Sequence, residues 1–219
     1  MKPIIVLNLK AYRESTGEAA IRLCEIASEV SLTSGIRIIV APQAVDLRPC
    51  AKVCEVFAQY CDAADWGAFT GSITPKALKD ANVLGSLINH SEKRVPHETI
   101  KKTIAALREA GLQSLVCSKD DAESAQVAAF SPDFIAVEPP ELIGSGISVS
   151  SAKPEVVINS VLAVQKVAKI PVLCGAGISN ATDVKKAIEL GAAGVLLASA
   201  YVKSADPKKL LSEMAGAIG

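Results

Sequence analysis

The sequence predicts an α/β protein in which eight strand and helix pairs close into a single (β/α)8 barrel. Short runs rich in Val, Ile and Leu alternate with longer segments of helical period, and this order is typical of parallel strands joined by helices. Eight pairs follow one another without a break in composition. The 219 residues divided among them allow about 27 for each pair, slightly fewer than the ~30 of a complete βαβ unit. We therefore expect one domain, residues 1–219, with shortened helices and loops. A doubly wound open sheet is the alternative.

The apolar runs place the strands in order along the chain. They are expected at residues 4–9, 37–41, 61–64, 84–89, 113–117, 134–137, 172–175 and 194–198. The run at 61–64 gives the weakest signal. Each of the others is rich in aliphatic residues, as expected for strands that are buried on both faces of a barrel.

Proline, glycine and serine residues mark the ends of the helices between these strands. Expected first helical positions are Pro96 and Pro154, and expected points where a helix turns into the next strand are Gly35, Gly111 and Gly191. Ser179 and Ser204 are expected N-caps, and Asp206 with Pro207 marks the start of the last helix. The helical segments therefore alternate with the strands throughout the chain.

The composition excludes several classes of partner. The 23 basic and 23 acidic residues cancel, so we expect no nucleic-acid partner and no anionic membrane partner. The six cysteines form no CxxC pair, and with only two histidines we expect no metal site. Free thiols fit a reducing cytosol, which predicts a cytoplasmic protein. The apolar stretches near the two ends are too short for a signal peptide or a membrane helix.

In a parallel barrel the polar residues that follow the strands converge on one face. The residues expected there are Asn8, Lys10, His90, Ser91, Glu92, Ser118, Glu138, Gly175, Ala176, Gly177, Ala198 and Ser199. This set contains one candidate base, one imidazole and one ammonium. It predicts a catalytic site at the carboxyl end of the barrel.

The glycine pair at 175 and 177 follows a strand and precedes a helix. A dinucleotide fingerprint is rejected because Asn180 replaces the third glycine and no acidic residue follows about 20 residues later. We expect no nicotinamide cofactor. The pair instead lets backbone N–H groups approach one phosphate, together with the short segment after the eighth strand at Ala198 and Ser199.

Six short motifs carry a resemblance to a known family. They are NLK at 8–10, GAFTG at 67–71, NHSEKR at 89–94, AVEPPELIGSG at 136–146, GAGIS at 175–179 and GVLLAS at 194–199. In this order and spacing the chain resembles the triosephosphate isomerases, in the compact form typical of archaea. The resemblance implies a TIM barrel and an isomerase of glycolysis and gluconeogenesis. It also implies interconversion of dihydroxyacetone phosphate and glyceraldehyde 3-phosphate through an enediolate, without metal or organic cofactor.

The resemblance assigns expected roles to the residues at the strand ends. Glu138 is the base, and Lys10 is the electrostatic stabiliser. His90 is the neutral donor that polarises the carbonyl, helped if the segment after it starts a helix. Asn8 orients Lys10 and a substrate oxygen. Ser91 is expected to hold Glu138 in an open position, and Glu92 to pair with Lys10. His97 is expected at the surface, and Glu141 as a solvated charge.

A lid over residues 138–146 is expected to close over the substrate. Gly146 would then donate its N–H to the phosphate, joined by Ala176, Ser179, Ala198 or Ser199, with Gly175 lining the same phosphate site. Three positions depart from the commoner bacterial and eukaryotic pattern: Asn89 stands where glycine is usual, Lys93 where arginine is usual, and Ser72 where glutamate is usual. The apolar stretch 66–75 predicts docking into a second subunit of a homodimer or homotetramer.

Two other classes of function remain open at this stage. A sugar-phosphate epimerase or lyase would share the phosphate loops but would need a metal or paired aspartates. A non-catalytic phosphate-binding barrel would tolerate substitution of Glu138. The combination of Asn8, Lys10, His90 and Glu138 favours the isomerase over both.

Overall fold

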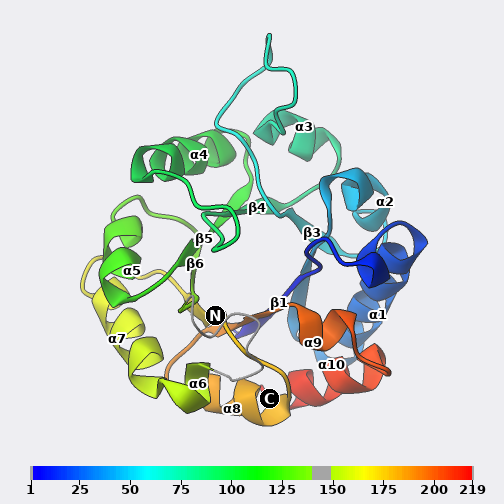
Figure 1. Cartoon of the computed structure of the whole chain (residues 1–219), viewed down its shortest axis with the longest axis vertical. Helices are drawn as coiled ribbons and strands as arrows, with labels where there is room; N and C mark the ends of the chain where they lie inside the picture. Colours follow the sequence, from blue (N-terminus) through cyan, green and yellow to red (C-terminus); the bar gives the residue numbers. More distant parts are fainter. Residues whose placement is uncertain (1, 140–148, 219) are drawn as a thin grey trace.

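The computed structural model describes residues 2–139 and 149–218. Within these residues eight parallel strands pair in sequence order, and the last pairs with the first, so that the sheet closes (Figure 1). Helices surround this barrel on the outside. The predicted (β/α)8 barrel is therefore confirmed, and the doubly wound open sheet is excluded.

The strands of the described residues lie close to the predicted runs, with one exception. They are β1 Ile4–Asn8, β2 Arg37–Ala41, β3 Glu55–Ala58, β4 Gly85–Ile88, β5 Gln113–Ser118, β6 Phe134–Val137, β7 Val172–Cys174 and β8 Gly194–Leu197. The bounds of β2 and β6 agree with the prediction, and five others differ by one or two residues in total. The exception is β3.

The third strand precedes the predicted run at 61–64, so that prediction was wrong. Its first residue, Glu55, is exposed, and only three buried residues follow, which hides the strand signal in the sequence. The helix before it, α2 (Leu47–Cys50), is a single turn, so the chain returns to the sheet earlier than expected. Phe57 fills the barrel interior beside Gly85, where an added Cβ would lie 2.8 Å from the ring.

The helices and 3₁₀ turns of the described residues follow the strands as predicted. They are η1 Arg13–Ser15, α1 Glu18–Ser34, η2 Ala44–Asp46, α2, α3 Pro75–Asp80, α4 His97–Glu109, α5 Asp121–Ala128, α6 Val149–Ala152, α7 Pro154–Gln165, α8 Ala181–Glu189, α9 Ser199–Val202 and α10 Pro207–Gly216. Gly35 caps α1 with φ +68°, and Gly111 and Gly191 also have positive φ, as expected.

Two predicted N-caps lie one or two residues too early. Asn180 caps α8 by accepting from the N–H of Asp183, and Asp206 caps α10 by accepting from the N–H of Lys209. Ser179 and Ser204 stand just outside these caps. Pro96 is likewise the residue before α4, whereas Pro154 is the first residue of α7 as predicted.

The apolar core has two layers. One fills the barrel interior, with side chains such as Val6, Phe57, Leu115 and Leu173, and the other lies between the sheet and the helices. Because strand side chains alternate between these layers, the strand ends are held rigidly from both sides. Any polar residue one step beyond a strand is thereby fixed at the mouth of the barrel.

Candidate active site

The candidate site lies at the carboxyl ends of the strands. On β6 the interior positions are Phe134 and Ala136, so the next interior position is Glu138, one residue beyond the strand. By the same alternation Asn8 of β1 and Gly175 after β7 face the interior. The topology therefore brings together residues that are far apart in the sequence, as the strand-end argument predicted.

Glu138 is almost fully buried, with 2% of its surface exposed. Its backbone N–H donates to the carbonyl oxygen of Ser118 at 2.7 Å, which ties it to β5. Its Oε1 lies 3.4 Å from Nε2 of His90, and its Oε2 is buried without a hydrogen-bond partner among the described residues. A buried carboxylate oxygen with no donor is costly for stability. It is also free to accept a proton from a bound molecule.

Gly175 makes room for this carboxylate. A Cβ at this position would lie 2.6 Å from Cγ of Glu138 and 3.1 Å from the carbonyl oxygen of Val137. Neither neighbour moves easily, since one is buried and the other is strand backbone. The glycine predicted for phosphate approach is thus also required for the packing of Glu138.

His90 is held in one tautomer by a backbone contact. The N–H of Glu92 donates to Nδ1 of His90 at 3.2 Å, so Nδ1 is an acceptor and the ring proton of the neutral imidazole is on Nε2, the nitrogen that faces Glu138. Help from a helix N-terminus was expected only if a helix followed His90, and α4 begins at His97, beyond the turn at 91–93. A single N–H from the turn at 91–93 takes the place of the helix N-terminus.

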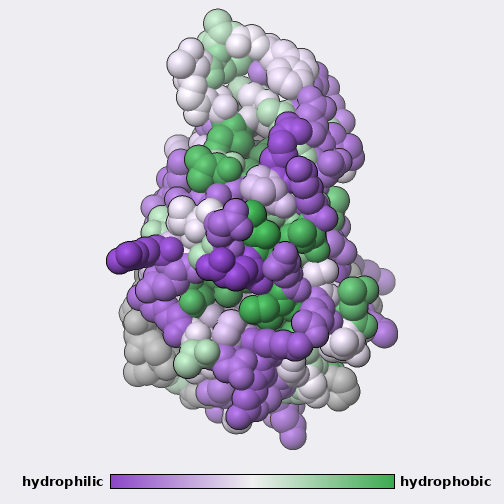
Figure 2. Space-filling view, turned by 90° about the vertical axis from the view of Figure 1, so that its right-hand side faces the viewer, coloured by the Kyte–Doolittle hydropathy of each residue, from purple (hydrophilic) through white to green (hydrophobic). Residues whose placement is uncertain are grey.

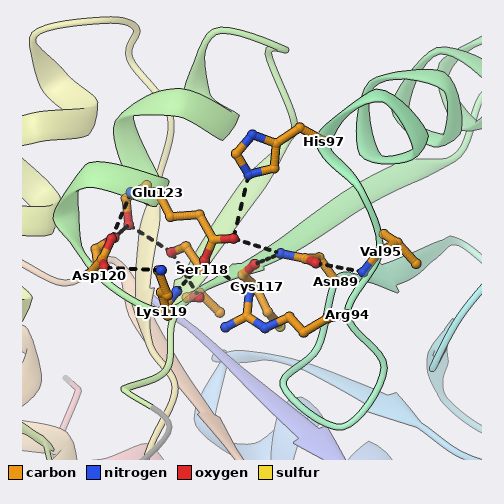
Figure 3. Close-up of polar contacts among 11 residues, drawn as sticks. Asn89, Arg94, Val95, His97, Cys117, Ser118, Lys119, Asp120 and Glu123 are labelled. Atoms are coloured by element: carbon orange, nitrogen blue, oxygen red, sulfur yellow. Dashed lines mark hydrogen bonds and ion pairs between the residues drawn. The ribbon is translucent and has the colours of Figure 1, made fainter.

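Asn89 fixes the backbone immediately before His90 (Figure 3). It adopts φ +62°, a conformation that asparagine tolerates better than most residues, so it meets the backbone requirement of the glycine that is usual there. Its Nδ2 donates to the carbonyl oxygen of Cys117 at 2.9 Å, and its Oδ1 accepts from the N–H of Val95 at 3.1 Å. The side chain thus closes the loop of residues 89–95, called the His90 loop, and joins it to β5.

Glu123 of α5 is the centre of the polar network behind this loop (Figure 3). Its carboxylate accepts from the N–H of Lys119 at 2.7 Å, from Nη1 of Arg94 at 3.0 Å and from Nδ2 of Asn89 at 3.3 Å. His97 lies at the surface as predicted, with Nε2 3.7 Å from Oε1 of Glu123. These contacts brace the His90 loop from outside the cavity.

Lys10 is held in a strained conformation with φ +49°. Its N–H donates to Oδ1 of Asn8 at 3.0 Å, and its carbonyl oxygen accepts from Nε2 of Gln59 at 2.9 Å. The ion pair expected with Glu92 is present, with Nζ 2.7 Å from Oε1. Gln59 was not predicted as a site residue. It directly follows β3, but the third strand was predicted at 61–64, so Gln59 did not appear at a strand end.

A cavity of about 410 Å³ opens beside Glu138. Its lining consists of Lys10, Tyr12, His90, Glu138, residues 175–179, residues 196–200 and Lys203. A second cavity of about 270 Å³ lies on the other side of Lys10 and His90, and Asn8 lines this one instead. Asn8 therefore positions Lys10 from behind and does not face the cavity that holds Glu138.

Most of the predicted phosphate-binding residues line the cavity beside Glu138. Gly175, Ala176, Ala198 and Ser199 are among them. Ser179 also lines it. Its N–H and hydroxyl both donate to Oδ2 of Asp183, at 3.0 Å and 2.9 Å, and its role as a phosphate donor stays a prediction. Gly146 lies outside the described residues, as do Glu141 and most of the predicted lid.

The bond expected between Ser91 and Glu138 is not formed. Oγ of Ser91 is buried without a hydrogen-bond partner in the described part of the chain, and the carboxylate of Glu138 faces His90 instead. The structure therefore has the carboxylate of Glu138 beside the imidazole of His90 and not in the open position expected from the sequence.

The cysteines are all free thiols. Burial, reinforced by the nearby carboxylate of Glu138, raises the pKa of Cys117 well above its ordinary value, and burial raises the pKa of Cys174 to about 12. Both thiols stay protonated at neutral pH and are not nucleophiles. Across residues 2–139 and 149–218 no group of His, Cys, Asp or Glu has the arrangement of a metal site. None of the helices there has the length and apolar character to cross a membrane.

Comparison with known proteins points to one family, both by a family model and by individual relatives. The family model described as triosephosphate isomerase matches residues 3–214. The chain is 53% identical over 216 residues to the triosephosphate isomerase of Methanothermus fervidus, with 97% of each chain covered. It is 48% identical to that of Methanothermobacter thermautotrophicus, covering 97% of this chain and 94% of the relative. It is 49% identical to that of Methanocaldococcus jannaschii, covering 96% and 98%.

Proposed function

The chain belongs to the triosephosphate isomerase family and interconverts dihydroxyacetone phosphate and glyceraldehyde 3-phosphate, and we propose that Glu138, His90 and Lys10, with Asn8 behind them, carry out this reaction. The observation that carries the assignment is the buried carboxylate of Glu138 at the cavity, whose Oε1 lies 3.4 Å from Nε2 of His90 and whose Oε2 has no hydrogen-bond partner among the described residues. The family is a well-known example of a glutamate base acting with a neutral histidine, and these two roles are taken from it.

In the proposed mechanism Glu138 removes the proton from the carbon next to the substrate carbonyl. The carboxylate becomes a carboxylic acid, and the electron pair of the broken C–H bond moves into an enediolate. Nε2–H of His90 donates to the carbonyl oxygen, where negative charge develops. Glu138 then returns a proton to the former carbonyl carbon, while the hydroxyl proton on the deprotonated carbon passes through Nε2 of His90 to the former carbonyl oxygen. The carbonyl group has then moved by one carbon, the base is regenerated, and no atom is gained or lost.

The ammonium of Lys10 stabilises the enediolate and the phosphate. Such a preorganised charge costs no reorganisation when the substrate reacts, and one donor of this kind is commonly worth about 3 kcal/mol in the transition state. Asn8 and Gln59 hold the Lys10 backbone from both sides, at 3.0 Å and 2.9 Å. We assign both as positioning residues and keep the catalytic role for Lys10.

The phosphate is proposed to lie against the loops after β7 and β8. Gly175, Ala176, Ala198 and Ser199 line this part of the cavity. The first N–H groups of a helix have no acceptor within it, which leaves those at the start of α9 available to phosphate oxygens. Gly146 remains a proposed donor to the phosphate.

The domain organisation is also proposed. Residues 1–219 are proposed to form one catalytic domain.

Substitution Gly175→Ala tests the position of the base. The added Cβ has no room beside Cγ of Glu138, so the carboxylate must shift, and a displacement of about 1 Å lowers kcat by about 100-fold. Steady-state kinetics with glyceraldehyde 3-phosphate measure this. Gly216→Ala is the matched control, because an added Cβ there meets nothing within 4 Å and, as at Gly175, no positive φ makes alanine unfavourable. Equal kcat in both variants would contradict the proposed packing.

The reaction itself is tested by following the incorporation of deuterium from the solvent into the product. In D2O the protein should convert glyceraldehyde 3-phosphate to dihydroxyacetone phosphate that carries deuterium at the hydroxymethyl carbon, since the proton held by Glu138 exchanges with solvent. An epimerase or lyase would give other products, and a non-catalytic phosphate-binding barrel would give none. NMR spectroscopy of the products distinguishes the three classes.

A homo-oligomer is proposed from the loop between Asp62 and Ile73, called the 62–73 loop. Two hydrogen bonds close its base, from the N–H of Asp62 to the carbonyl of Ile73 at 2.8 Å and from the N–H of Ile73 to Oδ2 of Asp62 at 2.9 Å. It projects at the top of Figures 1 and 2, where its surface is mostly pale and not strongly hydrophilic. Trp66 and Phe69 are 61% and 51% exposed. Burial of these rings against a second copy favours association.

The double substitution Trp66→Ser with Phe69→Ser should release single chains. Size-exclusion chromatography with light scattering is expected to give the mass of an oligomer for the parent and of one chain for the variant. Leu32→Ser is the matched control, because Leu32 is 83% exposed but lies at the end of α1, outside this loop. A parent that is fully active as a single chain would refute the proposed assembly.

A cytoplasmic location is also proposed. It rests on the six free thiols, which persist in a reducing compartment. The substrates belong to glycolysis and gluconeogenesis, in agreement with the family.

A further inference from the structure

Lys203 is a second lysine at the cavity that holds Glu138. It directly follows the one-turn helix α9, and its N–H donates to the carbonyl oxygen of Ser199 at 2.9 Å. Lys203 is exposed and lines the cavity, as Lys10 does. The ammonium lies 4.5 Å from the centroid of the Tyr12 ring, a distance at which a cation is attracted to the face of an aromatic ring.

Tyr12 forms a fixed support for this ammonium. Its carbonyl oxygen accepts from the N–H of Ser15 at 3.2 Å and from the hydroxyl of Thr16 at 3.1 Å, so the backbone that carries the ring is anchored by the turn η1. The ring is half-buried and lines the cavity. A lysine side chain that would otherwise sample many rotamers is thus held at the mouth of the site.

The two ammonium groups differ in their partners. Lys10 is paired with the carboxylate of Glu92 at 2.7 Å. Lys203 has no carboxylate within 4.0 Å among residues 2–139 and 149–218. Its cation–π contact leaves its N–H groups available to an anion. The positive charge of Lys203 is therefore less compensated than that of Lys10.

Lys203 adds a second cation to the lining of the cavity. Among the described residues, the charged side chains that line it are Lys10, Lys203 and Glu138. The charge of Lys10 is already compensated by Glu92, which lies outside this cavity. The phosphate monoester of the substrate carries about −1.5 to −2 at pH 7, so the ammonium of Lys203 attracts it.

We propose that Lys203 is a phosphate-binding residue, whose ammonium moves from the face of Tyr12 to the phosphate group of the bound triose phosphate. This proposal rests on the proposed function of the same cavity and names the side chain that recognises the dianion alongside the backbone amides. A charge-assisted hydrogen bond of this kind changes affinity without taking part in proton transfer. Loss of this hydrogen bond is therefore expected to change KM and the binding of inhibitors, and not kcat.

The test compares Lys203→Met, Lys203→Arg and Lys209→Met. Lys203→Met is expected to raise both KM for glyceraldehyde 3-phosphate and the competitive inhibition constant of inorganic phosphate by roughly tenfold, with kcat within about twofold of the parent. Lys203→Arg keeps the charge and should stay within about threefold of the parent in all three constants. Lys209→Met removes the same charge from exposed α10, outside the cavity, and should change none of them.

Binding of inorganic phosphate to Glu138→Gln, with and without Lys203→Met, separates this proposal from the function on which it rests. Calorimetry should show roughly tenfold weaker binding in the double variant. If Lys203→Met leaves phosphate binding and inhibition unchanged, or lowers kcat alone, Lys203 does not bind the phosphate, although the isomerase mechanism stands. If the parent fails to isomerise triose phosphates but still binds phosphate through Lys203, the mechanism fails and the phosphate site stands.

Discussion

Glu138→Gln is expected to lower kcat by about 10³-fold to 10⁴-fold. The amide keeps the shape of the side chain but cannot take a proton from carbon, and general base catalysis contributes up to about 10⁴-fold. No other carboxylate lines the cavity within the described residues, so no neighbouring group substitutes for it. Steady-state kinetics in both reaction directions measure the loss, which should appear in kcat with little change in KM.

The same substitution should leave the fold intact or stabilise it. Glu138 is 2% exposed, and its Oε2 has no hydrogen-bond partner in the described residues, so this buried polar side chain is held at a cost in stability. The neutral amide is less costly to bury. Thermal unfolding is expected at the temperature of the parent or up to about 4 °C above it, the shift that about 1 kcal/mol gives at this chain length.

Two further variants test whether the loss of kcat comes from the position of the carboxylate at residue 138. Glu138→Asp keeps the charge but withdraws the carboxylate by one methylene, and a misplacement of about 1 Å costs about 100-fold in rate. Glu98→Gln makes the same chemical change on the exposed face of α4 and should have no effect on kcat. If Glu138→Gln isomerises triose phosphates like the parent, the base has been assigned to the wrong residue.

The strands could be predicted because a closed parallel barrel buries both faces of each strand. A run such as 37–41 or 134–137 is continuously apolar and needs no tertiary information to be recognised. The third strand lacks this signal, since exposed Glu55 begins it and only three buried residues follow. Its position is fixed by pairing with β2 and β4, through contacts such as Val40 with Val56 and Phe57 with Gly85, which local pattern does not reveal.

The site could be predicted as far as it depends on strand ends. Glu138 and His90 follow strands whose ends were placed to within one residue, and the barrel topology then brings their side chains to 3.4 Å. Gln59 was missed with the third strand. Lys203 was missed because its place depends on how a one-turn helix directs it onto Tyr12, a contact between residues nearly the whole chain apart.

Hydrogen-bond networks were also beyond sequence reasoning. Asn89 was recognised only as a departure from the usual glycine, whereas in the structure its amide joins the His90 loop to β5 and to Glu123. The value of this side chain depends on a positive φ and on acceptors from other elements. Neither is encoded in local periodicity. The sequence therefore identified Asn89 as an unusual residue but did not predict its hydrogen bonds.

His90→Gln is expected to lower kcat by about 10²-fold to 10³-fold. Removing one donor that stabilises a developing oxyanion commonly has an effect of this size. The N–H of Glu92, which donates to Nδ1 of His90, fixes the imidazole with Nε2 towards the substrate, and a glutamine amide has neither this rigid geometry nor a proton that it readily transfers. The loss should fall on kcat, with the inhibition constant of inorganic phosphate little changed.

His97→Gln is the matched control, since His97 is the other histidine of the 219 residues. It lies 3.7 Å from Glu123 on the outer side of the His90 loop, with 44% of its side chain exposed, and does not line the cavity. Its replacement should leave kcat within about twofold of the parent, because a largely exposed contact at 3.7 Å contributes little. An equal loss in both variants would mean that the network behind the loop, and not the imidazole at the cavity, supports the reaction. A loss confined to His90→Gln assigns the donor to Nε2 of His90.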